Sequence, residues 1–430
     1  MPAFSREILK RSQKPDKQHI MITGKAGCGI RYAVKRGGSA VAYCALGISC
    51  GTRSEAGFHS GIAHFTEHTL FKGTANKSSS VINGYLDKLG GELNAYTTKE
   101  EIVLHATVLK EDLPKAESLL LEIATSAMFP DNEVDTERGV VIDEIKSYKD
   151  SPADDIYDRF EEKLFVGHPL SMPILGTVKS VKAITAEELR KFMKDKFVPQ
   201  SMAFTIVADI DEKKMEADAR KMFSKFFGDN ADDSGGQARL KPVVLDNVFS
   251  EVLHKRNHEA NAVIGGFAPS LYEEKERIAT VLMSNILGGP AMNSILNSVL
   301  REKHGWVYGV ETSYTQYSDT GILAISLGCE RENLEKCMAA INRELAKLQE
   351  SELSDRKLNA AKKQLLGQLA ISSDNGEAQC LGMGKSLLAY GMVSSSEETR
   401  RQVEAVTAAE IRDMACRIFA PGRTSSLIML

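Results

Sequence analysis

The sequence predicts an α+β fold made of two similar halves, each an antiparallel β-sheet with helices packed on one face. The first observation behind this prediction is an internal repeat, in which residues 181–190 (VKAITAEELR) resemble residues 403–412 (VEAVTAAEIR) at an offset of 222 residues. The second is the order of segments, because strand-like stretches come in groups and helical stretches follow in groups. That order favours α+β over a doubly wound parallel sheet.

The repeat also predicts the domain boundaries. Shorter matches support it: residues 197–199 resemble 419–421 at the same offset, and residues 112–115 resemble 333–336 at an offset of 221. Halves of this length are in the usual size range of domains. We therefore expect a first domain at residues 1–227, a polar, glycine-bearing linker at 228–240 and a second domain at 241–430.

Individual elements of the first half follow from residue types and periodicity. Strand character is clearest in stretches rich in β-branched and aromatic residues, namely Gly29–Lys35, Ser39–Leu46 and Ile102–Val108. Helical periodicity predicts three helices, over Leu113–Met128, Pro152–Phe165 and Ala186–Phe197. Asp112 and Thr185 are predicted N-caps, and Glu188 stands at capping-box spacing from Thr185.

The composition excludes several classes of protein. With 430 residues and 43% apolar content, the chain can bury two cores, and its net charge of −4 offers no basic surface for nucleic acid. No apolar run approaches the length of a membrane span. The seven cysteines are odd in number and lack CxxC pairing, which favours reduced thiols and a cytoplasmic protein. Residues 1–19 carry five lysines and arginines, but acidic residues interrupt them, so import into an organelle is the lesser alternative.

A His-x-x-Glu-His motif at residues 64–68 is the strongest functional signal. Residues four apart share a helix face, so His64 and His68 could hold one metal ion, with Glu67 beside them to take a proton from water. The alternative is a surface helix with two incidental histidines. The context favours the metal helix, because Gly61 precedes an apolar pattern at helical spacing that ends at Lys72-Gly73. The motif has the residue order of an inverted zincin.

A catalytic zinc site needs a third protein ligand and leaves one position for water. The candidate is Glu144, which falls near Glu137 on a predicted helix. When the repeat is extended at an offset of 221, the second half has no residues equivalent in type to His64, Glu67, His68 and Glu144. The equivalent positions hold Asn285, Gly288, Gly289 and Leu365. Residues needed only for packing would persist in both copies, so we expect the chemistry in the first half.

The motif, followed by Glu144 76 residues after His68, resembles the insulinase or pitrilysin metallopeptidases. The resemblance is closest to the subgroup that includes mitochondrial processing peptidase and its bacterial relatives, and it covers nearly the whole chain. Three further segments carry it, namely Gly51–Glu55, Leu89–Thr97 and Leu300–Tyr308. Pro290 departs from the small residues that relatives often have after the pair Gly288-Gly289.

The resemblance implies a zinc-dependent endopeptidase. His64, His68 and Glu144 would bind Zn²⁺, which would activate a water molecule and polarise the scissile carbonyl. Glu67 would act as general base and then as general acid. Glu137 has two interpretations that remain open here: it orients a metal-binding histidine, or it is a solvated helix residue.

The resemblance also implies how substrate is held. Asn94 and Ala95 would hydrogen-bond an extended substrate backbone, Tyr308 would stabilise the oxyanion and Arg301 would anchor the substrate. Members of the family enclose peptides or unfolded segments in a chamber, and longer members need four such domains, so a homodimer is implied. The rival function is a non-proteolytic scaffold or partner subunit of a peptidase-like assembly. The complete set of motif residues favours the peptidase.

Overall fold

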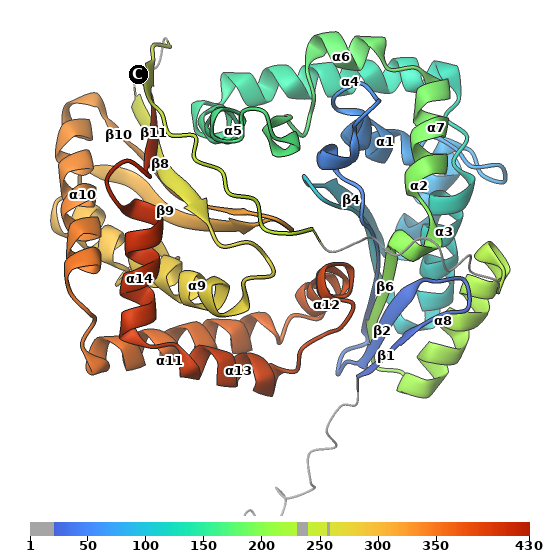
Figure 1. Cartoon of the computed structure of the whole chain (residues 1–430). Helices are drawn as coiled ribbons and strands as arrows, with labels where there is room; N and C mark the ends of the chain where they lie inside the picture. Colours follow the sequence, from blue (N-terminus) through green and yellow to red (C-terminus); the bar gives the residue numbers. More distant parts are fainter. Residues whose placement is uncertain (1–20, 230–239, 256–258) are drawn as a thin grey trace, which may run out of the picture.

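The computed structural model describes residues 21–229, 240–255 and 259–430. Most of the predicted linker at 228–240 and the basic stretch at 1–19 lie outside these residues. Two halves, each made of one β-sheet and several helices, lie side by side (Figure 1).

The first half is built on a six-stranded sheet in the order β1-β2-β6-β3-β5-β4. Its strands are β1 Ile22–Lys25, β2 Arg31–Arg36, β3 Val41–Ile48, β4 Glu92–Thr97, β5 Ile102–Leu109 and β6 Met202–Ala208. Its helices are α1 Ile62–Leu70, α2 Ser79–Asp87, α3 Leu113–Ser126, α4 Asp131–Asp150, α5 Pro152–Leu164, α6 Val178–Ala183, α7 Ala186–Lys196 and α8 Glu212–Phe227. Helices α3 and α8 cover one face of the sheet.

The second half has a five-stranded sheet in the order β7-β11-β8-β10-β9. Its strands are β7 Ser250–Leu253, β8 Glu259–Ala268, β9 Val307–Gln316, β10 Gly321–Glu330 and β11 Ser425–Met429. Its helices are α9 Glu274–Gly288, α10 Leu334–Glu350, α11 Asp355–Ser372, α12 Gly376–Tyr390, α13 Ser396–Ala405 and α14 Ala408–Phe419. This strand order repeats that of the first sheet without β1.

The predicted α+β fold of two similar halves is therefore confirmed, with two additions. Each sheet contains one parallel pair, β2 with β6 and β7 with β11, among otherwise antiparallel neighbours. Parallel neighbours need a long crossover, and in each half the connection contains three other strands of the sheet and a series of helices.

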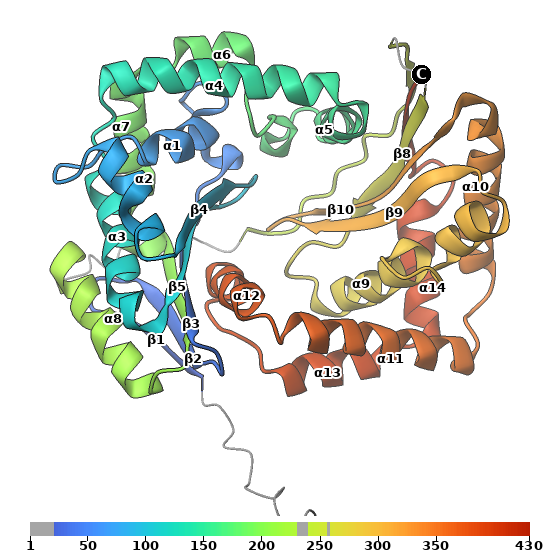
Figure 2. The ribbon, with the colours of Figure 1, turned by 180° about the vertical axis from the view of Figure 1, so that it is seen from behind.

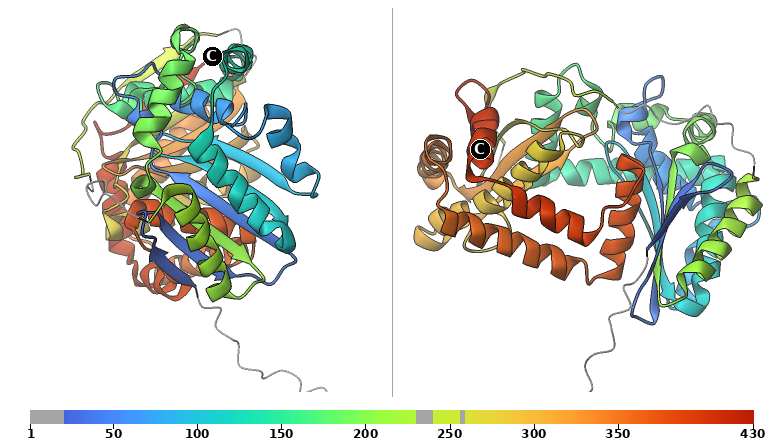
Figure 3. Two further views of the ribbon diagram at one scale, coloured as in Figure 1. Left: turned by 90° about the vertical axis from the view of Figure 1, so that its right-hand side faces the viewer. Right: turned by 60° about the horizontal axis from the view of Figure 1, so that its bottom comes forward.

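The second addition is an exchange of equivalent helices between the halves. Successive residues of a strand point to opposite faces, so Cys44 and Leu46 of β3 join the core under α3, whereas Ala45 faces α12 of the second half. In return, α5 of the first half packs on β8 and β11. Figure 3 (right) shows the orange-red α12 lying against the first sheet. The central strands of each sheet are therefore buried on both faces, and the exchange joins the halves.

The predicted helix caps are partly wrong. Thr185 accepts a hydrogen bond from the amide of Glu188, as predicted, but the Glu188 carboxylate accepts from the amide of His59 instead of completing a capping box. Asp112 makes no capping bond and pairs with Lys115 at 2.7 Å. The reason is its backbone, because Asp112 ends a 3₁₀ turn with φ −98° and ψ 0°, whereas an N-cap needs extended angles.

Among the described residues, no helix is long and apolar enough to cross a membrane.

Candidate metal centre

Helix α1, which carries the His-x-x-Glu-His motif, begins at a position that only glycine occupies easily. Gly61 has φ 89°, and a Cβ there would lie 2.7 Å from the carbonyl oxygen of Leu175. The buried carboxylate of Glu55 accepts hydrogen bonds from the amides of Gly61 and Ala63, both at 3.0 Å. These bonds satisfy amides that the first turn of a helix leaves free, and they fix where the motif starts.

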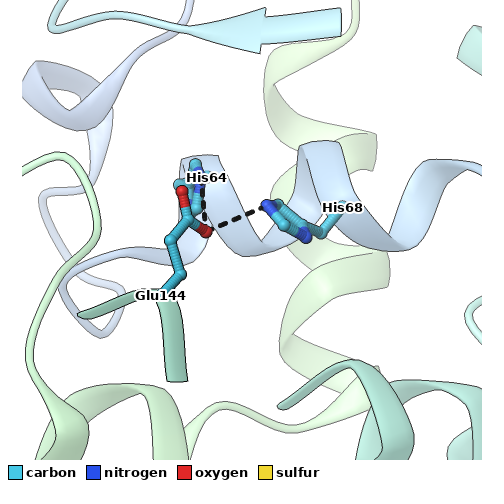
Figure 4. Close-up of side chains that lie close together, drawn as sticks. All are labelled: His64, His68 and Glu144. Carbon is cyan, nitrogen blue, oxygen red and sulfur yellow. Dashed lines mark ion pairs between the residues drawn. The ribbon is translucent and has the colours of Figure 1, made fainter. Parts of the chain in front are cut away.

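The structure brings His64, His68 and Glu144 together. One ligand atom from each lies within 4.8 Å of the others, and this is the only such group in the part of the chain that the structure describes. Oε2 of Glu144, on α4, is 3.7 Å from Nε2 of His64 and 3.4 Å from Nε2 of His68 (Figure 4). Two imidazole nitrogens and a carboxylate oxygen are the donor set of a catalytic zinc site.

The surroundings of these atoms fit a cation. Oε2 of Glu144 is buried and accepts no hydrogen bond from the described residues, which is costly for a carboxylate unless a positive group stands beside it. Burial, and then the neighbouring His68, lower the pKa of His64 to about 4, so this imidazole is neutral, the form that binds metal. The three side chains would therefore hold a divalent metal ion such as zinc.

Glu137, on α4 like Glu144, lies beside His68. It is 7% exposed, and its Oε1 is 2.9 Å from Nδ1 of His68, while its Oε2 is 2.6 Å from Nζ of Lys72. Burial would lower the pKa of His68, but the hydrogen bond to Glu137, followed by the nearby Glu144 and Glu67, raises it to about 9. A proton held on Nδ1 by Glu137 leaves Nε2 directed toward Glu144.

Glu67 is linked to the edge of the first sheet. Oγ1 of Thr97, the last residue of β4, donates to Oε2 of Glu67 at 2.9 Å. Burial raises the pKa of Glu67 against the lowering effects of His68 and of this hydrogen bond. Asn94 and Ala95 lie on the same strand. Within the described residues β4 pairs only with β5, so its other edge has no partner strand there.

Arg301 and Tyr308 lie in the second half. Arg301 is in the helical segment Asn297–Lys303. Tyr308, 54% exposed, is in β9, one of the two edge strands of the second sheet as described. The Tyr308 hydroxyl donates to Glu330, which raises the pKa of Tyr308 to about 12. Within the described residues, neither side chain is bonded to His64, His68 or Glu144 of the same chain.

The second half has an amide pair where the first half has His64 and the other candidate metal ligands. Asn285, at the repeat position of His64, lies on α9, and its Nδ2 donates to Oε1 of Gln368 on α11 at 2.7 Å. Leu365, at the repeat position of Glu144, is buried. This arrangement offers no imidazole or carboxylate to a metal ion.

The sequence had indicated no role at the site for two residues that lie there, Lys72 and Thr97. Lys72 stands four residues after His68, so helical spacing could have placed it near Glu137. Thr97 had no such signal, because its bond to Glu67 depends on how closely β4 approaches α1.

Two family profiles match the chain. The one described as Insulinase (Peptidase family M16) matches residues 32–178, which contain the metal cluster, and the one described as Peptidase M16 inactive domain matches residues 183–365. Among the relatives is a protein of Mycobacterium tuberculosis called an uncharacterized zinc protease, which is 30% identical to this chain. The aligned region covers 86% of this chain and 83% of the relative. An uncharacterized zinc protease of Streptomyces coelicolor is 29% identical over 88% of this chain and 82% of its own.

Solved structures share the fold. A protease from Helicobacter pylori superposes with a TM-score of 0.87 at 20% identity, covering 96% of this chain and 99% of that chain. A Pseudomonas fluorescens structure described as a peptidase M16 inactive domain gives 0.85 at 19% identity, covering 95% of this chain and 97% of that chain.

Proposed function

Because this chain belongs to the insulinase family of peptidases, we propose that it is a zinc-dependent endopeptidase that hydrolyses peptides or unfolded segments. The observation that carries the proposal is the convergence of His64, His68 and Glu144, with Glu67 beside them on the same helix. Relatives that match most of the chain are named zinc proteases, which supports zinc as the metal.

When bound, zinc lowers the pKa of water and polarises the scissile carbonyl. Glu67 accepts a proton from the attacking water and delivers it to the leaving amine. Its raised pKa suits both transfers, because a more basic carboxylate takes a proton more readily near neutral pH. The Thr97 hydroxyl holds one oxygen of Glu67 and leaves the other for the proton. Glu137 keeps Nε2 of His68 directed toward the metal.

Substrate binds as an extended strand along the free edge of β4. Asn94 and Ala95 offer backbone groups there, and pairing of this kind requires an extended chain. We further propose a homodimer in which Arg301 and Tyr308 of one chain act at the metal cluster of the other. The exposure of Tyr308 and its place on the edge strand of the second sheet support this arrangement.

A non-proteolytic scaffold is the alternative function, and one profile that matches this chain is described as an inactive domain. That profile covers residues 183–365, the part in which Asn285 and Leu365 replace metal ligands. The cluster around His64 lies in the segment that the other profile matches. The division supports a catalytic first half joined to a second half without a metal site.

The function is tested with zinc-loaded protein and two substrates. We expect quenched-fluorescence peptides of about ten to thirty residues to be cut, and a stably folded domain to resist, because only an exposed extended backbone can pair with β4. A chelator should abolish cleavage, and added zinc should restore it. Failure to cut any member of an unstructured peptide library would contradict the proposal, and internal cutting of the folded domain would contradict a closed chamber.

The shared site predicts complementation between inactive chains. If Glu67→Gln and Arg301→Ala proteins exchange subunits in equal amounts, half of the dimers are mixed and one of their two sites is intact, giving about a quarter of wild-type activity. The control mixes Glu67→Gln with Glu144→Gln, whose lesions lie in the same half, and should recover nothing. Persistent inactivity of the first mixture, with mixed dimers confirmed by mass spectrometry, would show that each chain builds its own site.

A further inference from the structure

Two equivalent hairpin tips, one from each half, contact each other where the two halves of the molecule meet. The β4–β5 tip is residues 98–101 and the β9–β10 tip is residues 317–320. In each turn the amide of the first residue donates to the carbonyl of the fourth, at 2.8 Å and 2.9 Å. The β9–β10 hairpin reaches toward β4 in Figures 1 and 2. There the Glu100 carboxylate accepts from the amide of Ser318 at 3.0 Å.

A single arginine bonds to both tips. Nη1 of Arg53 donates to Oδ1 of Asp319 at 2.7 Å and to Oε1 of Glu100 at 2.9 Å, and Nη2 donates to the second oxygen of Asp319. Asp319 is only 3% exposed. Burial would raise the pKa of Asp319, but Arg53, and then His168 at 3.3 Å, outweigh burial and hold it below the usual value, so the carboxylate is ionised. We call Arg53, Glu100, Ser318 and Asp319 the tip network.

Helix α5 strengthens the same junction. The buried hydroxyl of Tyr317 donates to Oε1 of Glu161 at 2.6 Å, and Nζ of Lys99 lies 3.7 Å from the other oxygen of Glu161. Each tip therefore supplies one residue to the exchanged helix. A buried charge is costly once its partner is removed, so the tips are held in one relative position.

The β4–β5 tip adjoins the residue that holds the proposed base. Thr97, which donates to Glu67, immediately precedes the tip. On its other side the tip is fixed by the segment before α1: the Arg53 amide donates to the carbonyl of Lys99 at 2.9 Å, and a Cβ on Gly51 would lie 2.3 Å from the carbonyl oxygen of Thr98. Since β4 has one partner strand in the part of the chain that the structure describes, a loosened tip would carry the Thr97 hydroxyl away from Glu67.

We propose that Asp319, although it lies in the half without metal ligands, is a positioning residue for the first half. Through Arg53 and Glu100 it fixes the β4–β5 tip and thereby the hydrogen bond from Thr97 to Glu67. The second half then contributes to the site of its own chain through this contact, in addition to any residue that it offers to a partner chain. The role in catalysis rests on the proposed peptidase function, whereas the effect on β4 does not.

The test compares Asp319→Asn with Asp155→Asn. Asp155 is a matched control, because it is also buried, at 6% exposed, and joins the halves by pairing with Lys255, but it lies on α5 outside the tip network. Asp319→Asn should lower kcat by about ten- to a hundredfold without changing zinc affinity, because a small displacement of a catalytic group is costly. It should also speed amide hydrogen exchange over residues 92–101. Asp155→Asn should change neither, and Asp319→Glu should recover part of the loss.

Several results would overturn the inference. Unchanged amide hydrogen exchange over residues 92–101 in Asp319→Asn would overturn it, whether or not the wild-type protein cleaves peptides. Faster exchange in Asp319→Asn with an unchanged kcat would also overturn it. Equal losses in Asp319→Asn and Asp155→Asn would indicate general loosening of the halves. If Asp319→Asn does not fold, Arg53→Lys replaces it, since lysine keeps the charge but cannot pair with both oxygens. If zinc-loaded wild type is inactive, the proposed function fails and the exchange measurement alone decides the effect on β4.

Discussion

Glu67→Gln is expected to reduce peptide cleavage by about a hundred- to ten-thousandfold while zinc stays bound, the range usually lost with a general base. The amide keeps the shape of the side chain and can still accept from Thr97, but it cannot take a proton from water. Glu67 is not one of the three converging ligands, so zinc content should equal that of the wild type. The measurement is kcat/KM on a quenched peptide together with zinc per chain.

The control for this variant is Glu187→Gln, the same change at an exposed position in the first turn of α7. It should cleave like the wild type. Near-wild-type turnover by Glu67→Gln would rule out Glu67 as the base. Loss of zinc together with activity would instead place Glu67 among the metal ligands.

Glu144→Gln is expected to lose both zinc and activity. Its carboxylate stands between the two imidazoles, so removing the charge leaves two neutral nitrogens and an amide, and zinc affinity should fall by more than about a hundredfold. Competition with a chromogenic chelator measures this affinity. The loss of cleavage should be partly reversed by excess zinc, which distinguishes a lost ligand from a lost base.

Glu137→Gln, on the same helix, is the matched comparison for Glu144→Gln. Glu137 touches His68 and Lys72 but is not among the three ligands, so we expect a smaller loss of zinc affinity, about ten- to a hundredfold. Wild-type zinc affinity in Glu144→Gln would show that another group is the third ligand. Equal losses in the two variants would mean that Glu144 acts only by orienting a histidine.

The residues of the candidate metal centre could be proposed from the sequence because their relation is mostly local. His64, Glu67 and His68 are related by the geometry of one helix, which depends on spacing alone. The internal repeat singled out the same residues, since positions 285 and 365 hold Asn and Leu. The bond between Glu137 and His68 was left open, because it depends on how α4 lies across α1.

The exchange of helices could not be predicted. An amphipathic helix has the same apolar pattern whichever sheet it covers, so the sequences of α5 and α12 do not state that each packs on the sheet of the other half. The capping of α7 could not be fully predicted for the same reason. The spacing of Thr185 and Glu188 suited a capping box, but His59 comes close enough in the fold to take the carboxylate.

The sequence by itself determined the two halves, their α+β elements and the spacing of the ligands, because a repeat and a helical period are properties of neighbouring positions. Only the tertiary structure decided that Thr97 holds Glu67, and that Arg53 bonds both to Glu100 and to Asp319, which lies 266 positions after Arg53 in the chain. Such pairs form where packing brings distant groups into a buried space. In such a space an unpaired charge or hydroxyl is costly, so each of these groups pairs with whichever polar group the fold places next to it.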